Sequence, residues 1–265
     1  MLPPVRSLVR GIAPHGAVLI YDAFKGVDLD RIAVLRVAPL ETLADRRALE
    51  ALLPQIGLAD LFTSIYPTEL QPFLGQGLQC LQWPNQLAPY LVTLSRYPIR
   101  RYLEIGVLRG GTFMTTVEYL DRFHPLERAW GVDLFHSVPV YRYLPRQRKA
   151  RMVRTRSGTP EFRRKVEQWR PDLVLIDADH SYAAVRADFE SVHGVANMVA
   201  FHDITDSASP GVTKLWAELR EQHGDVYDFV DFTEQYGEVT DRIGGTLLGI
   251  GLAVRKDFGP PLTGV

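Results

Sequence analysis

The sequence Glu104-Ile105-Gly106-Val107-Leu108-Arg109-Gly110-Gly111-Thr112 joins the end of an apolar run to a glycine-rich turn and a helix start, and this combination indicates the fold class. Glycine lets the backbone turn tightly and approach a ligand closely. The helix that follows would direct its free N–H groups and positive dipole end toward that ligand. The spacing is not that of the three-glycine dinucleotide fingerprint. Glu104 would repel a phosphate and favour a cationic amino group, although an ordinary strand-to-helix turn has the same pattern.

From Arg101 onward, short apolar runs alternate with helical patterns. Continuous apolar strands separated by helices predict a mostly parallel sheet covered on both faces, a Rossmann-like α/β fold. In such sheets, ligands bind beyond the carboxyl ends of the strands. We expect strands at Arg101–Ile105, Ala129–Leu134, Met152–Thr155, Leu173–Ile176, Asn197–Phe201, Tyr227–Phe232 and Thr246–Val254.

The first part of the chain lacks this alternation. We interpret residues 1–82 as an N-terminal extension and residues 83–265 as the α/β domain. Two interpretations of the extension stay open, an acceptor-binding lid and an oligomerisation segment.

Composition excludes several classes of protein. The 265-residue chain has a net charge of -1, which gives no electrostatic argument for a nucleic-acid partner. Its single cysteine, Cys80, excludes an internal disulfide framework and a Cys-rich zinc site. No apolar run approaches the roughly 18 residues of a spanning helix, and Met1–Pro14 lacks the features of a signal peptide. We therefore predict a cytoplasmic protein without a transmembrane segment.

The second expected strand reaches an acidic residue, in Gly131-Val132-Asp133. An acidic side chain at this place can accept both hydroxyls of a ribose, and Asp133 follows Gly106 by about the interval that this role requires. A helix cap or a surface turn is the alternative for Asp133 alone. Together with Glu104, it favours a nucleoside ligand that carries an amino group.

Asp177 follows the fourth expected strand and Asp203 follows the fifth. If these strands are neighbours, the two carboxylates converge, which is costly unless one is protonated or a cation is present. Oxygen ligands suit Mg²⁺ or Ca²⁺. His180 lies three residues after Asp177, where a histidine can take a proton from a substrate near neutral pH. The alternatives are that both carboxylates cap helices or face the cofactor, and that His180 caps a loop.

The basic residues between the second and third strands run from Arg142 to Arg156. They are interpreted as a solvated helix face, with an anionic substrate or lipid surface as the second possibility.

These segments resemble the class I S-adenosylmethionine-dependent O-methyltransferases. Residues 102–106 and 110–112 look like the first motif of that family, and Asp133 matches the second. The stretches 172–182 and 201–204 are similar to the small-molecule group that contains the cephalosporin-biosynthesis and macrolide-sugar methyltransferases. The resemblance covers about residues 83–255. It implies a seven-stranded sheet whose last strand, Thr246–Val254, is antiparallel.

The resemblance also implies roles for individual residues. Glu104 would hold the amino end of the methionine moiety and Asp133 the ribose of S-adenosylmethionine. The other implied cofactor contacts are Gly106, Gly110, Thr112, Ser157 and Asp177.

The same group of enzymes implies a metal and a base. A divalent ion, Mg²⁺ or Mn²⁺, would be held by Asp177, His202 and Asp203, while His180 would be the base that acts together with Asp177. His202 departs from the pattern, because similar enzymes have a carboxylate there and imidazole suits Mn²⁺ better than Mg²⁺.

The expected function is therefore methyl transfer from S-adenosylmethionine to a hydroxyl of a small molecule: a sugar, a glycoside or an oligosaccharide. Assembly into a homo-oligomer is left open by the sequence. One rival is an NAD-dependent oxidoreductase on the same fold, which Glu104 and the glycine spacing disfavour. The other is a non-catalytic nucleoside-binding module, which would leave Asp177, His180 and Asp203 without a role.

Overall fold

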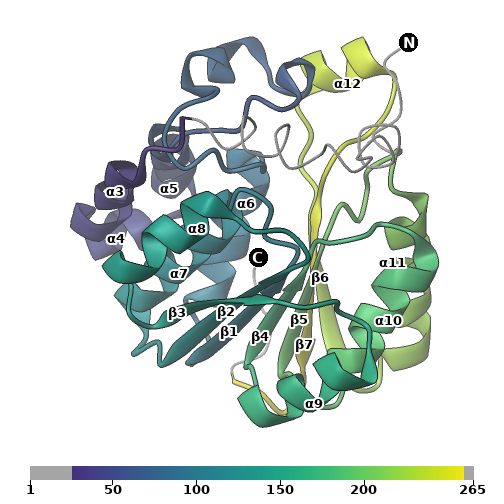
Figure 1. Ribbon diagram of the computed structural model, residues 1–265. Helices are drawn as coiled ribbons and strands as arrows, with labels where there is room; N and C mark the ends of the chain where they lie inside the picture. Colours follow the sequence, from purple (N-terminus) through teal and green to yellow (C-terminus); the bar gives the residue numbers. More distant parts are fainter. Residues whose placement is uncertain (1–25, 260–265) are drawn as a thin grey trace, which may run out of the picture.

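A computed structural model describes residues 26–259, so parts of both predicted units, residues 1–25 and 260–265, lie outside it (Figure 1). Seven strands form one sheet in the order β3-β2-β1-β4-β5-β7-β6. The pairs from β3 to β5 are parallel, and β7 runs antiparallel to β5 and β6. The Rossmann-like fold with an antiparallel last strand is thus confirmed. The strands are β1 (Arg101–Ile105), β2 (Arg128–Asp133), β3 (Ala150–Arg154), β4 (Leu173–Ile176), β5 (Met198–His202), β6 (Tyr227–Phe232) and β7 (Ile250–Arg255).

Helices cover both faces of the sheet (Figure 1). Side chains alternate across a strand, so Leu173 and Leu175 of β4 enter one apolar cluster while Val174 and Ile176 enter another. The first cluster lies under α6 (Pro84–Leu94) and α7 (Gly111–Phe123). The second lies under α9 (Pro160–Trp169), α10 (Tyr182–Val192) and α11 (Pro210–His223). Burial on both sides explains why β4 is continuously apolar.

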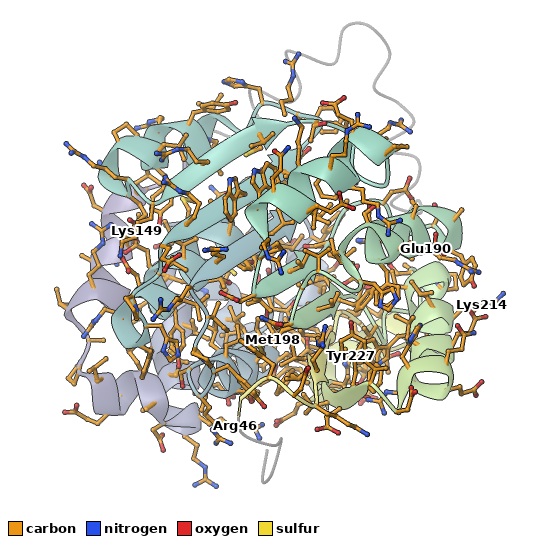
Figure 2. All side chains as sticks on the ribbon, turned by 90° about the horizontal axis from the view of Figure 1, so that it is seen from below. Arg46, Lys149, Glu190, Met198, Lys214 and Tyr227 are labelled. Carbon is orange, nitrogen blue, oxygen red and sulfur yellow. The ribbon has the colours of Figure 1, made fainter. Side chains whose placement is uncertain are left out.

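Several charged side chains lie at the periphery of the molecule. Figure 2 shows Lys149, Glu190 and Lys214 at the periphery, while Met198 of β5 lies in the interior with no exposed surface.

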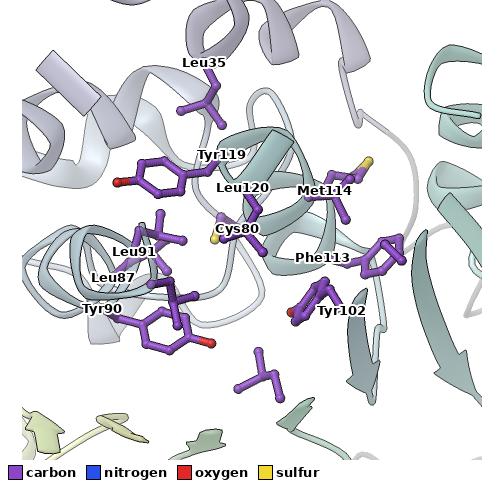
Figure 3. Close-up of a cluster of buried hydrophobic side chains, with 14 of the residues drawn as sticks. Leu35, Cys80, Leu87, Tyr90, Leu91, Tyr102, Phe113, Met114, Tyr119 and Leu120 are labelled. Atoms are coloured by element: carbon purple, nitrogen blue, oxygen red, sulfur yellow. The ribbon is translucent and has the colours of Figure 1, made fainter. Parts of the chain in front are cut away.

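The segment before α6 packs on the outer side of α7. Leu35 and Leu43 belong to the same buried cluster as Tyr119 and Leu120 of α7 (Figure 3). The Arg36 guanidinium forms two hydrogen bonds to the buried Glu118 carboxylate, at 2.6 and 2.7 Å. The elements of this segment are η1 (Leu29–Ile32), α3 (Ala33–Val37), α4 (Leu40–Ala44), α5 (Arg46–Leu52), η2 (Leu53–Ile56), η3 (Thr63–Ile65) and η4 (Thr68–Phe73). The division at residue 82 stays a prediction.

The last strand differs from its expected range, Thr246–Val254, because β7 begins only at Ile250. Leu248 and Gly249 have φ angles of 56° and 93°, which an extended strand does not permit. Residues 246–249 pair instead with the loop after β5, where the amide of Thr205 donates to the carbonyl of Leu248 at 3.1 Å. A helix that the sequence analysis did not predict, α12 (Gly237–Ile243), lies between β6 and β7.

The interpretation of the basic run as one helix face is wrong. Only its start lies in α8 (Val138–Tyr143) and η5 (Leu144–Arg146), whereas Arg151 and Arg154 lie exposed on β3. Because β3 is an edge strand of the sheet, exposed charges there oppose pairing with another chain.

Candidate active site

The glycine turn after β1 brings that strand against the chain that follows β4. Gly106 has a φ of 89°, and a Cβ atom at this position would lie 2.0 Å from the carbonyl oxygen of Asp177. Gly110 also has a positive φ, and its Cβ would lie 2.3 Å from a methyl group of Val140. Only glycine fits both the backbone conformation and the space at these two positions.

Asp133, the last residue of β2, holds this turn in place. One carboxylate oxygen accepts hydrogen bonds from the amides of Val107 and Leu108, both at 2.9 Å, and the other accepts from the amide of Phe135 at 2.9 Å. Leu108 itself has a φ of 45°, so these bonds support a conformation that is unfavourable for leucine. The sequence indicated a ribose ligand for Asp133 but not this anchoring role.

Glu104 is buried at the end of β1. Its side chain is 1% exposed, and Tyr102 Oη donates a hydrogen bond to Oε2. Burial raises the pKa of Glu104 well above its usual value, and the nearby Asp177 and Asp133 charges act in the same direction. A cationic ligand would stabilise the charged form of this buried carboxyl, which burial otherwise disfavours.

Two other residues that were expected to contact the cofactor, Thr112 and Ser157, lie beside polar groups of the protein. Thr112 Oγ1 lies 3.8 Å from Cys80 Sγ, in the first turn of α7. Ser157 lies close enough to the buried carboxyl of Asp188 on α10 to influence its pKa, which burial raises to about 6.

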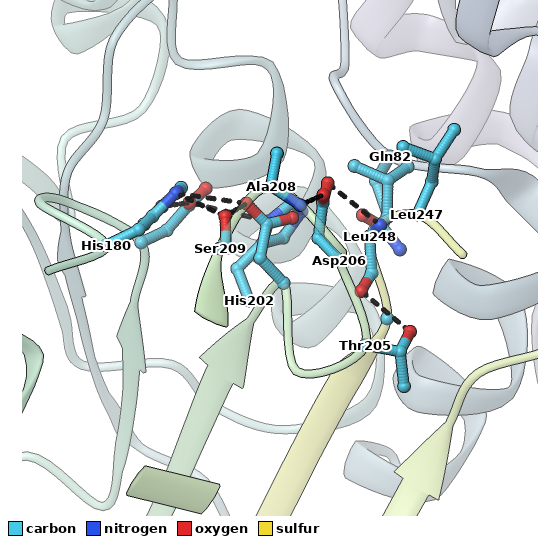
Figure 4. A network of polar contacts seen from close by, with 12 residues as sticks. Gln82, His180, His202, Thr205, Asp206, Ala208, Ser209, Leu247 and Leu248 are labelled. Atoms are coloured by element: carbon cyan, nitrogen blue, oxygen red, sulfur yellow. Dashed lines mark hydrogen bonds and ion pairs between the residues drawn. The ribbon is translucent and has the colours of Figure 1, made fainter. Parts of the chain in front are cut away.

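The residues after β4 and β5 form one polar cluster (Figure 4). His180 Nδ1 lies 3.1 Å from Asp203 Oδ2, and His180 Nε2 lies 3.3 Å from Asp177 Oδ1. His202 Nδ1 lies 2.8 Å from Asp203 Oδ1 and 3.5 Å from Asp177 Oδ1. The structure thus brings together all four residues that the sequence predicted for catalysis and metal binding.

Charge in this cluster is balanced by the two histidines. Burial alone would lower the pKa of His202, but the charges of Asp177 and Asp203 outweigh it and raise that pKa to about 10. Burial likewise opposes protonation of His180, yet Asp177 and Asp203 raise its pKa above the usual value. The pKa of Asp203 is lowered by the two histidines despite its burial. Asp203 also has a φ of 64°, a strained backbone conformation of the kind that clusters at functional sites.

The donor set can be tested against a metal ion. Between residues 26 and 259, no three His, Cys, Asp or Glu side chains are arranged as ligands of one ion. The short His202–Asp203 contact is not aligned as a hydrogen bond, however, and His202 Nε2 and Asp203 Oδ1 are buried without a hydrogen-bond partner. The donor chemistry therefore fits a divalent ion, while the carboxylates pair with imidazoles in the structure.

Ser209 and Gly211 are parts of this site that sequence reasoning missed. Ser209 Oγ lies 3.2 Å from His180 Nδ1 and 3.3 Å from Asp203 Oδ2, so it does not cap α11, which begins at the next residue. A Cβ at Gly211 would lie 2.5 Å from the carbonyl oxygen of His180. A serine before Pro210 is a helix-start signal, but the sequence does not show that its hydroxyl turns toward His180.

Part of the chain is similar to a known protein family. Residues 103–204 match the model of a family described as a methyltransferase domain. Over this segment, which is less than half of the chain, the sequence is similar to that family. The matched segment includes Glu104 and Asp133, and from the polar cluster it includes Asp177, His180, His202 and Asp203 but not Ser209. No curated protein sequence matches the chain.

Several solved structures are similar to the chain. A cofactor-bound protein of MTB, Rv0187, is 16% identical over 83% of this chain and 92% of its own, with a TM-score of 0.48. An O-methyltransferase from Bacillus cereus in complex with SAH is 14% identical over 83% and 93%, with a TM-score of 0.46. MycE, a methyltransferase of the mycinamycin biosynthetic pathway in complex with Mg, SAH and mycinamycin VI, is 18% identical over 66% and 51%, with a TM-score of 0.44. Such low values leave the function to be argued from this chain's own residues.

Within the part of the chain that is described, no helix has the length and apolar character required to cross a membrane.

Proposed function

We propose that this protein is a methyltransferase, which transfers the methyl group of S-adenosylmethionine to a hydroxyl of a small molecule: a sugar, a glycoside or an oligosaccharide. One observation carries the proposal. The buried Glu104, the glycine turn anchored by Asp133 and the His180 cluster all lie at the carboxyl ends of neighbouring strands. Glu104 supports binding of the ammonium group and Asp133 supports binding of the ribose, which leaves His180 for the acceptor. The sugar class rests on the family resemblance alone.

The proposed reaction is an in-line displacement at a methyl group that the sulfonium already activates. The protein's main task is then to align the acceptor and exclude water. His180 Nε2 would take the proton of the acceptor hydroxyl, which requires its contact with Asp177 to open. Asp203 and Ser209, both close to Nδ1, would hold the ring in the required orientation.

A divalent ion, Mg²⁺ or Mn²⁺, is part of the proposal, with Asp177, His202 and Asp203 as its ligands. When bound, such an ion would lower the pKa of the acceptor hydroxyl. A ligating histidine must be neutral, whereas the pKa of His202 is raised to about 10. Ion binding would therefore displace a proton from His202 and become tighter as the pH rises.

The cofactor assignment is tested by calorimetry with S-adenosylhomocysteine and, separately, with NAD⁺. Wild-type protein should bind the first and not the second. Asp133→Ala should weaken binding of S-adenosylhomocysteine by roughly 1–3 kcal/mol, because hydrogen bonds to a charged group are lost. Asp133→Asn keeps one acceptor oxygen for the amides of Val107 and Leu108 and should lose less. Binding of NAD⁺ alone would make the domain an oxidoreductase, and binding without any methyl transfer would favour a nucleoside-binding module.

The metal proposal is tested on turnover with a panel of hydroxylated acceptors. EDTA should abolish methyl transfer, and Mn²⁺ should restore it more fully than Mg²⁺, because His202 supplies a nitrogen ligand. His202→Glu should reverse this preference, since three carboxylates suit Mg²⁺. Undiminished turnover after thorough chelation would refute the metal and leave the transferase proposal intact.

A further inference from the structure

Tyr102 and Glu104 form a buried pair, and only Glu104 has a role in the reaction proposed above. They are two residues apart on β1, so both side chains point to the sheet face that α6 and α7 cover. The Tyr102 ring has no exposed surface and stacks on Phe113 of α7, with 6.0 Å between ring centroids and 19° between planes (Figure 3). Its hydroxyl donates to Glu104 Oε2. Packing thus fixes the donor in the direction of the carboxyl.

We propose that Tyr102 is a positioning residue that orients the Glu104 carboxylate, in its charged form, toward the ammonium group of the cofactor. This inference rests on the proposed function, because it assigns the ammonium to Glu104.

The surroundings of Glu104 explain why a dedicated donor is needed. Burial disfavours the charged carboxylate, and so do the carboxylates of Asp133 on β2 and Asp177 after β4. His202 on β5 and the Tyr102 hydroxyl favour it. Because burial raises the pKa of Tyr102 well above 10, its hydroxyl remains protonated and donates throughout the physiological range.

The test compares two ligands that share the nucleoside. S-adenosylhomocysteine carries the ammonium group, whereas 5′-methylthioadenosine lacks the entire amino-acid part. Tyr102→Phe should weaken binding of S-adenosylhomocysteine roughly 10- to 150-fold, the range for one hydrogen bond to a charged group. Binding of 5′-methylthioadenosine should change less than about twofold.

Tyr119→Phe is the matched control, since it also removes one buried tyrosine hydroxyl, which donates to the carbonyl of Leu43 at 2.8 Å. Tyr119→Phe should lower the thermal stability, but it should not change the affinity for one ligand more than the affinity for the other. In a Glu104→Gln background, Tyr102→Phe should cost little further affinity, because the charge that the hydroxyl stabilises is gone.

An equal loss for both ligands would show that Tyr102 is merely structural, and no loss for either would show that its hydrogen bond has no role in binding. Each result overturns the inference while the cofactor assignment stands. Failure of wild-type protein to bind either ligand would instead refute the proposed function.

Discussion

His180→Ala is expected to lower turnover by about 10²- to 10⁴-fold, the usual contribution of a general base. Affinity for S-adenosylhomocysteine should stay nearly constant, because the ring contacts Asp177, Asp203 and Ser209 and is proposed to face the acceptor. A bound metal that already lowers the hydroxyl pKa would place the loss near the lower limit. His223→Ala is a suitable control, since His223 is the last residue of α11, the helix that begins beside the site.

The same proposal predicts how the turnover of the wild-type protein depends on pH. A general base works in its neutral form, so turnover should rise as the pH increases through the pKa of His180. Its contacts with Asp177 and Asp203 raise that pKa above the usual 6.5, and the rise should therefore be centred above pH 6.5. A flat profile between about pH 5 and 8, together with near-normal turnover of His180→Ala, would assign the proton transfer to another group.

Gly106→Ala is expected to destabilise the protein by roughly 2–5 kcal/mol and to remove measurable cofactor binding. Two costs combine: alanine in the left-handed region, and a methyl group that forces the turn away from the Asp177 carbonyl, only 2.0 Å from the Cβ position. Urea unfolding measures the loss of stability, and calorimetry with S-adenosylhomocysteine measures the loss of cofactor binding.

Gly237→Ala provides the matched control. Gly237 lies in α12, has no positive φ, and a Cβ there would meet nothing within 4 Å. Its replacement should be neutral or slightly stabilising, because alanine loses less backbone entropy on folding. If Gly106→Ala matched Gly237→Ala in stability and bound the cofactor normally, the close approach of the β1 turn to Asp177 would have no functional importance.

Local sequence patterns are sufficient to locate most of the strands and the edge of the sheet that carries the candidate site. Val174 and Ile176 reveal a strand because burial on both faces leaves a continuous apolar run, and this signal is local. Glu104 and Asp177 could be identified for the same reason, since a polar residue at the end of an apolar strand is visible without knowledge of the neighbouring strands. The order of those strands was not visible locally, but the right-handed crossover of a parallel sheet leaves few alternatives.

Tertiary packing, by contrast, selects which polar groups become partners. The Ser209 hydroxyl lies beside His180, 29 positions away in the chain, because a glycine at 211 lets α11 approach that backbone. Asp133 anchors the turn of residues 107 and 108 because β1 and β2 are neighbours. Tertiary contacts also explain why β7 begins later than expected, since residues 246–249 form hydrogen bonds with the loop after β5 rather than extend the strand. Such contacts depend on how the packed elements approach one another, and no local pattern of residue types encodes that approach.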